Sequence, residues 1–244
     1  MRILSRREGG APPIVIAHRG ASRRALENSL EAFSLSLADR ADMIECDVRL
    51  SADGEPVVVH DARTGRTGRE NLTVARCDAA RLRNVRLHNG ERVPFLADVL
   101  DLVRGGVPLN IEVKTAGGVN ASLQVIDRMG YRGELILSSS LREECRAART
   151  SRPAIPCGLV TGRPSASDIA FCFRHGLASI HPDARRLSVL RIRKVVEAGL
   201  PFVPYTVDDE GEFFRLVGSG ASGVFSNRAE ELRKAWRELF PGEG

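Results

Sequence analysis

Short apolar runs alternate along the chain with longer segments in which apolar residues recur every three or four positions. The first pattern is typical of buried strands and the second of helices. The predicted strands lie at 14–18, 43–50, 108–115, 135–139, 157–160, 178–180, 202–207 and 223–226. The predicted helices lie at about 30–39, 95–104, 120–129, 141–150, 166–175, 188–198, 209–217 and 229–239.

This alternation predicts an α/β fold. Eight strands that are each followed by a helix imply parallel βαβ units, which close into a (β/α)8 TIM barrel. A doubly wound open sheet is the alternative, but the first turn reads HRGAS (18–22) and not the GxGxxG of dinucleotide-binding folds. We expect residues 1–244 to form one domain.

Two segments after the second strand interrupt the alternation. Residues 55–60 are predicted to form a short extended arm. Residues 62–93 are rich in Arg, Thr, Gly and Asn, with one short helix expected near 78–84. We therefore expect a small inserted subdomain at 62–93, over one end of the barrel.

The composition is that of an ordinary globular protein, with 43% hydrophobic and 27% charged residues. The net charge of +5 is dispersed, without a block of like charge, so no nucleic-acid partner is expected. Five scattered Cys without a CxxC pair favour a reducing compartment. No signal peptide over residues 1–13 and no membrane-spanning run are visible, which predicts a cytoplasmic protein without a stable membrane anchor. The oligomeric state is left open.

Reactive side chains gather at the predicted ends of the first strands, where TIM barrels place their active sites. Glu45 and Asp47 are two residues apart on a strand and therefore share a face, as do Glu112 and Lys114. Cys46, between the two acids, points to the opposite face and is expected to pack there. The candidate residues are His18, Arg19, Glu45, Asp47, His60, Glu112 and Lys114.

Three inward carboxylates repel one another unless a cation lies between them. Glu45, Asp47 and Glu112 offer only oxygen ligands, which favours Mg²⁺ or Ca²⁺ over zinc. His18 and His60 are suited to proton transfer near neutral pH. Together with the neighbouring Arg and Lys, these groups are what the cleavage of a phosphodiester requires.

Several motifs resemble those of the glycerophosphodiester phosphodiesterases, in the same order and at the same spacing. They are HRGAS (18–22), EN-S (27–29), AF (32–33), IE-x-D-V (44–48), D-G-x-P-V-V-V-H-D (53–61) and EVK (112–114). The resemblance is dense over residues 14–61 and weaker toward the C-terminus. It implies a TIM barrel with a small insertion after His60, and the hydrolysis of glycerophosphodiesters to glycerol 3-phosphate and an alcohol.

The resemblance also implies the roles of the candidate residues. Glu45, Asp47 and Glu112 would hold a divalent metal, Mg²⁺ or Ca²⁺, and His18 and His60 would be the acid–base pair, with acid and base unassigned. In the implied reaction the glycerol 2-hydroxyl attacks phosphorus, and water then opens the cyclic phosphate.

For the substrate, the resemblance implies contacts of Arg19 and Lys114 with the phosphate, although both could instead pair with the carboxylates. Tyr205, where the family often has Trp, would pack against glycerol as a pocket wall, or would instead belong to the core. Leu26 and Ser226-Asn227 also depart from the family pattern, in which Pro and Thr-Asp are usual. These departures leave the alcohol group of the substrate open.

Other functions and roles are left as alternatives. The barrel could be a phospholipase-type enzyme acting on lysophospholipid or phospholipid, or a non-catalytic barrel that binds phosphate groups. Asn28 either caps a helix or belongs to the site, and Asp61 is expected to orient a neighbour and not to bind the metal. His88, His175 and His181 are expected on the surface or in loops, and His181 has a smaller chance of lining the mouth.

Overall fold

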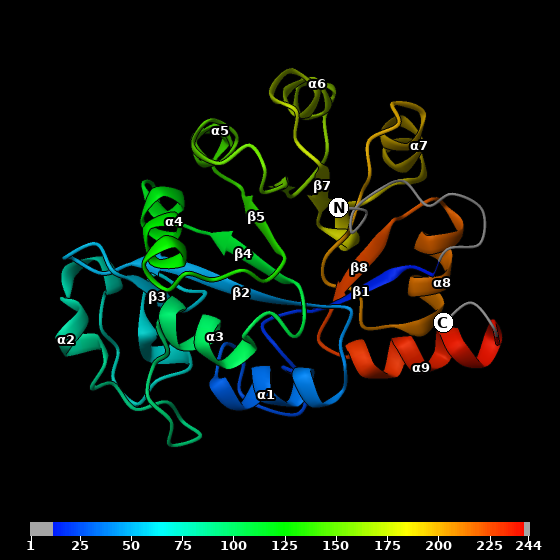
Figure 1. Cartoon of the computed structure of the whole chain (residues 1–244). Helices are drawn as coiled ribbons and strands as arrows, with labels where there is room; N and C mark the ends of the chain where they lie inside the picture. The colour runs from blue at the N-terminus through cyan, green and yellow to red at the C-terminus, as the bar shows by residue number, and fades with distance from the viewer. Residues whose placement is uncertain (1–11, 242–244) are drawn as a thin grey trace.

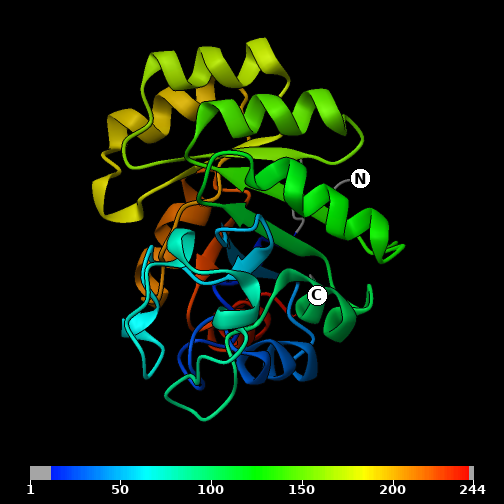
Figure 2. The same ribbon diagram turned by 90° about the vertical axis from the view of Figure 1, so that its left-hand side faces the viewer.

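The computed structural model describes residues 12–241, so the expectation of no signal peptide falls mostly outside the described residues. Strands curve around a central axis and helices cover their outer face (Figures 1 and 2). The strands are β1 (Ile14–Ala17), β2 (Met43–Leu50), β3 (Pro56–Val58), β4 (Leu109–Val113), β5 (Leu135–Ser139), β6 (Cys157–Thr161), β7 (Ser179–Pro182) and β8 (Gly223–Ser226).

The main helices follow the strands closely and agree with the predicted ones to within a few residues. They are α1 (Leu30–Ala38), α3 (Leu96–Val103), α4 (Gly118–Arg128), α5 (Arg142–Ser151), α6 (Ala166–His175), α7 (Val189–Glu197), α8 (Glu210–Gly218) and α9 (Ala229–Leu239). The short helix expected near 78–84 is α2 (Ala79–Leu82). Three 3-10 turns complete the described elements: η1 (Thr64–Arg66), η2 (Val74–Arg76) and η3 (Ala184–Arg186).

The sheet has the strand order β7-β6-β5-β4-β2-β1-β8, and all pairs along this path are parallel. The arm β3 pairs antiparallel with the outer half of β2. The register places Asp47 of β2 opposite Glu112 of β4. Because inward positions alternate, Glu45, Asp47 and Glu112 face the same interior, and Cys46 packs outward in the main core as predicted.

The prediction of a regular strand at 202–207 is wrong, although this segment does complete the barrel. It makes isolated bridges, and the N–H groups of Val203 and Tyr205 donate to carbonyls of β7. On its other side, the N–H of Phe225 donates to the carbonyl of Pro204. Pro204 has no N–H to donate, so a continuous ladder cannot form there. The segment lies between β7 and β8 and thereby closes the predicted (β/α)8 TIM barrel.

Three apolar clusters hold the fold together. The largest lies between the strands and the surrounding helices. A second fills the barrel interior with Ile16, Met43, Ile136, Val203 and Phe225. The third joins the segment 62–93, which contains α2 and protrudes from the barrel (Figure 1), to β3. It consists of Val57, Val59, Val74, Leu82, Val85, Leu87, Val93 and Phe95. The insertion after strand two is thus present, whereas the extent of one domain over 1–244 stays a prediction.

His181 does not lie on the surface or in a loop, which corrects the preferred expectation. It lies on β7 with only 1% of its surface exposed, and its Nε2 is 2.8 Å from the Ser179 hydroxyl oxygen. Its ring also lies 5.0 Å from that of Phe225, centroid to centroid. The sequence offered only a short apolar run at 178–180, too little to show that the strand continues through His181.

The burial of His181 predicts a pH-dependent stability. Burial lowers the pKa of His181 from 6.5 to about 3, so the unfolded chain binds its proton between these values and the folded chain does not. Stability therefore falls as the pH falls below 6.5, by about 2 kcal/mol at pH 5 from this group. We expect His181→Gln to lose correspondingly less stability than the wild type between pH 7.5 and pH 5 in urea unfolding. Equal losses in both proteins would contradict the prediction.

Candidate active site

The turn after β1 brings His18 and Arg19 against the carboxylates of β2. Arg19 has φ +59°, uncommon for a non-glycine residue, and its backbone N–H donates to Glu45 Oε2 at 2.8 Å. Gly20 follows with φ +80°, and a Cβ there would lie 2.7 Å from the backbone of Ala32. The glycine is therefore required for the turn to pack on α1, and the strained Arg19 is held by its bond to Glu45.

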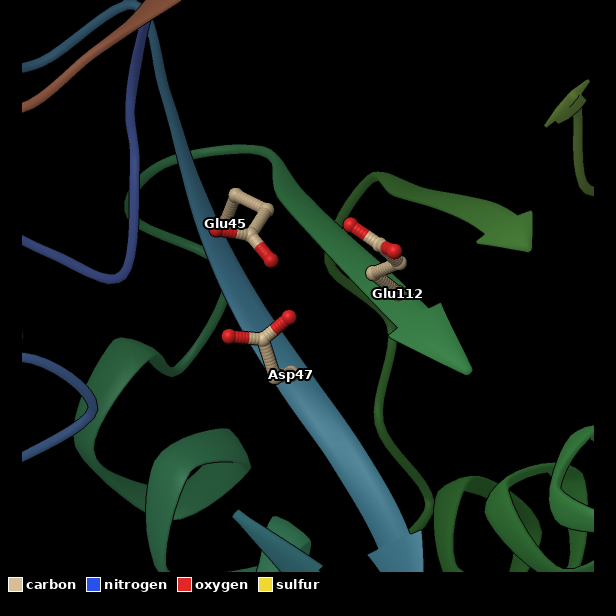
Figure 3. A group of neighbouring side chains, drawn as sticks. All are labelled: Glu45, Asp47 and Glu112. Carbon is tan, nitrogen blue, oxygen red and sulfur yellow. The ribbon is translucent and has the colours of Figure 1, made fainter. Parts of the chain in front are cut away.

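Glu45, Asp47 and Glu112 form a compact carboxylate cluster inside the barrel. Each offers one oxygen, and these oxygens all lie within 4.8 Å of one another. Figure 3 shows the side chains of β2 directed toward Glu112 on β4. Glu45 and Asp47 are fully buried, and Glu45 Oε1 accepts no hydrogen bond from the described residues. A buried carboxylate oxygen without a donor is unfavourable unless a cation binds it.

The pKa shifts of the cluster also indicate that Arg19 and Lys114 do not fully compensate the negative charge of the three carboxylates. Burial, and then the charges of Asp47 and Glu112, raise the pKa of Glu45 well above its ordinary value. Burial likewise raises the pKa of Asp47, but Lys114 and Arg19 outweigh it and hold this pKa below its usual range. The cluster therefore contains an ionised Asp47 beside Glu45, whose ionisation is unfavourable. Its all-oxygen donors fit a hard divalent cation.

Arg19 and Lys114 are paired with the cluster in this structure. Arg19 Nε lies 3.2 Å from Asp47 Oδ2, and Lys114 Nζ lies 3.0 Å from Asp47 Oδ1 and also bonds Glu112. Burial lowers the pKa of Lys114, but Glu112 and Asp47 raise it above its ordinary value, so the ammonium is fully charged. Pairing with carboxylates was the alternative for these two residues, and their contact with phosphate stays a prediction.

His18 is held at its Nδ1 by residues from the far end of the chain. Nδ1 lies 2.9 Å from Asn227 Oδ1, while Asn227 Nδ2 donates to Asp208 Oδ2 at 2.7 Å. An amide oxygen can only accept, so His18 carries its proton on Nδ1 and leaves the Nε2 lone pair free. Burial, and then the charge of Arg19, lower the pKa of His18 to about 4. The imidazole is therefore neutral near pH 7.

His60 is held in the same way by its neighbour Asp61. Its Nδ1 lies 2.6 Å from Asp61 Oδ1, which leaves Nε2 free, and about a third of its side chain is exposed. Arg66 donates from Nε to Asp61 Oδ2 at 2.5 Å, and this bond holds the pKa of Asp61 at about 2. Asp61 thus orients a neighbour, as the sequence predicted. Both His18 and His60 lie near enough to Asp47 to lower its pKa.

A chain of alternating charges joins the inserted segment to the carboxylate cluster. Arg66, in η1 of the insertion, donates to both oxygens of Glu27, from Nη1 at 2.6 Å and from Nη2 at 2.8 Å. Glu27 in turn accepts from Arg19 Nη1 at 2.8 Å. The insertion therefore fixes His60 through Asp61 and fixes Arg19 through Glu27, so both sides of the site depend on Arg66.

Asn28 belongs to the site, because the helix cap is Ser29, whose side chain accepts from the N–H of Ala32. Asn28 Nδ2 donates to Asp47 Oδ2 at 2.8 Å, and its Oδ1 accepts from the Asp47 N–H. Tyr205 is half-buried on the closing segment, and Glu112 is among the groups that raise the pKa of its phenol, after burial. Tyr205 also packs against the interior apolar cluster, and its contact with glycerol stays a prediction.

Sequence reasoning missed the residues that orient the two imidazoles. In the sequence, Asn227 stands out only as a departure from the family pattern, and nothing predicts a role for Asp208, Glu27 or Arg66. Their positions after the ends of strands could have placed Asp208 and Asn227 at the mouth. No local pattern pairs Glu27 with Arg66, which are 39 residues apart.

The sequence model of the glycerophosphoryl diester phosphodiesterase family matches residues 18–231, which span the whole site. The chain belongs to this family. Members hydrolyse glycerophosphodiesters, and the chain is an enzyme of this phosphodiesterase class, as its motifs predicted.

Relatives and solved structures agree over nearly the full length. A glycerophosphodiester phosphodiesterase of Caldanaerobacter subterraneus subsp. tengcongensis is 28% identical, with 90% of this chain and 96% of the relative covered. A phosphodiesterase of Oleispira antarctica, solved with the product sn-glycerol-3-phosphate, has a TM-score of 0.85 at 25% identity, over 91% of this chain and 96% of that one. The Thermotoga maritima glycerophosphodiester phosphodiesterase has a TM-score of 0.77 at 26% identity, covering 92% and 98%. Among the described residues, none of the helices has the length and apolar character needed to span a membrane.

Proposed function

We propose that the protein hydrolyses soluble glycerophosphodiesters to glycerol 3-phosphate and an alcohol, with two histidines as proton carriers and a divalent metal as cofactor. The observation that supports this most directly is that His18 and His60 have the same hydrogen-bonding arrangement. Each Nδ1 is held by an oxygen acceptor, and within residues 12–241 neither Nε2, beside the same carboxylate cluster, has a hydrogen-bond partner. One free nitrogen can accept a proton while the other, once protonated, donates one.

The chemistry needs two proton transfers. In the first step, the glycerol 2-hydroxyl loses its proton to one imidazole as its oxygen bonds to phosphorus. The bond from phosphorus to the alcohol breaks, and the second imidazole gives its proton to the departing oxygen. Water then opens the cyclic phosphate with the two histidines in exchanged roles, which returns both to their starting states.

Glu45, Asp47 and Glu112 would hold the metal, because their oxygens converge and Glu45 Oε1 lacks a donor. A bound divalent ion would neutralise charge on the phosphate oxygens. Arg19 and Lys114 would then share their charge between the cluster and the phosphate. Asn28 keeps Asp47 oriented through two hydrogen bonds, so that its carboxylate does not rotate away.

Tyr205 would form the wall against which the glycerol part packs, since it lies on the closing segment near Glu112. The partner is therefore a small glycerophosphodiester. The cytoplasmic location and the absence of nucleic-acid partners stay predictions.

The test is the release of glycerol 3-phosphate from glycerophosphocholine, glycerophosphoethanolamine and glycerophosphoinositol. We expect release that EDTA abolishes and that Mg²⁺ or Ca²⁺ restores. Activity that persists in EDTA after dialysis would reject the metal, and the folded, metal-loaded protein releasing nothing from any of the three would reject the substrate class. Lysophospholipid, offered in parallel, tests the phospholipase-type alternative.

A further inference from the structure

Arg49 is an inward residue of β2 that takes no part in the proposed metal site or acid–base pair. It lies two residues beyond Asp47, and therefore on the same face of the strand as Glu45 and Asp47 but closer to the mouth. Its Nε donates to the backbone carbonyl oxygen of His60 at 2.7 Å. The guanidinium is thereby anchored beside a proposed proton carrier.

Arg49 differs from the other cations of the site in lacking an acidic partner. Arg19, Lys114 and Arg66 each form ion pairs with carboxylates of the site. In the part of the chain that the structure describes, Arg49 forms no ion pair, and only its Nε makes a side-chain hydrogen bond. Its two terminal nitrogens remain available to a ligand.

The surroundings of Arg49 favour an anion. The side chain is half-buried, and Asp47, Asp61 and Glu112 lie near enough to act on its charge without forming an ion pair with it among the described residues. A half-buried guanidinium without a paired carboxylate gains more from an added oxyanion than one already neutralised. A planar fork of donors also suits two oxygens of one phosphate or carboxylate.

We propose that Arg49 forms an oxyanion-binding subsite at the outer edge of the active site, where its terminal N–H groups bind a substrate oxyanion. This proposal rests on the proposed function. The oxyanion has two sources: the phosphate that is cleaved, or an anionic group on the alcohol. In either case Arg49 supplies positive charge to the substrate, because Arg19 and Lys114 are also paired with the carboxylates of the cluster.

The variants are Arg49→Gln, which removes the charge, and Arg49→Lys, which keeps it without the fork. Arg63→Gln is the matched control, because this exposed arginine of the inserted segment already donates to Asn71 and Thr73. All variants are first compared by thermal unfolding, so that a folding defect is recognised. Arg49→Lys provides the second variant if Arg49→Gln unfolds.

The first measurement is calorimetric titration with sn-glycerol 3-phosphate, and the second is hydrolysis of glycerophosphocholine and glycerophosphoserine. A charged hydrogen bond contributes about 1.5–3 kcal/mol, so we expect Arg49→Gln to weaken binding or raise KM by at least about tenfold. Arg49→Lys should be intermediate and Arg63→Gln unchanged. Weaker product binding with equal KM increases for both substrates identifies the cleaved phosphate, whereas an increase confined to glycerophosphoserine identifies the anionic alcohol.

The proposal is overturned if Arg49→Gln binds glycerol 3-phosphate normally and keeps both KM values, even with a lower kcat. That result would leave Arg49 only a support for His60. A wild type that binds glycerol 3-phosphate through Arg49 but hydrolyses neither substrate would reject the proposed function and keep the subsite.

Discussion

Replacing His18 or His60 with alanine is expected to lower kcat by at least about 100-fold while leaving the fold intact. General acid–base groups typically contribute about 100- to 10,000-fold. His60 is about one-third exposed, whereas His18 is buried with its ring 6.5 Å from that of Phe225, centroid to centroid, and each is tied to the protein by a hydrogen bond at Nδ1. Turnover is measured with the preferred glycerophosphodiester under saturating metal.

His88→Ala is the matched control, because His88 is exposed on the inserted segment. It should keep full turnover. Near-normal turnover in His18→Ala or His60→Ala would remove that residue from the proposed acid–base pair. A large fall in thermal stability would instead show that the residue supports the fold.

Glu45→Gln is expected to have opposite effects on the metal-free and the metal-loaded protein. Without metal, the neutral amide removes both the cost of burying a charge and the repulsion with Asp47 and Glu112, which together raise the pKa of Glu45, so Tm should rise or stay equal. With metal, the wild type should gain about 2.7 kcal/mol at a hundredfold excess over Kd, or roughly 5–10 °C in Tm. The variant should lose most of this gain.

Thermal unfolding in EDTA and across a series of Mg²⁺ and Ca²⁺ concentrations measures both effects. Glu55→Gln is the control, because Glu55 lies in the turn before β3 and outside the cluster. An unchanged metal-dependent rise in Tm in Glu45→Gln would exclude Glu45 as a ligand. A strong loss of stability in EDTA would show that its bond from the Arg19 N–H matters more than the repulsion.

The network around Arg66 changes how the insertion is understood. From the sequence, residues 62–93 are expected only to lie over one end of the barrel. In the structure, Arg66 of this segment contacts Glu27 and Asp61 and so reaches both sides of the site. Insertions at barrel mouths adapt one scaffold to different substrates. Here the insertion also takes part in orienting a proposed catalytic group.

Local patterns in the sequence predict nearly all of the elements and the face on which the reactive residues of β2 and β4 lie. Period-two alternation placed Glu45 and Asp47 together inside and Cys46 outside, and apolar spacing located the helices to within a few residues. These features depend on near neighbours in the chain, because burying an apolar face requires a periodic pattern whatever lies opposite. The motifs around His18 and His60 are likewise short stretches of neighbouring residues, which can be recognised without the fold.

Contacts between residues far apart in the chain, across the barrel, follow from the tertiary fold and could not be predicted from local patterns. Asn227 reaches His18 over 209 residues, and the closing segment at 202–207 is held by β7 and β8 without forming a regular strand. His181 became a buried residue because β7 extends past the apolar run that predicted it. Periodicity reports the face of an element but not its partner, and the partner depends on how the eight units close around one axis.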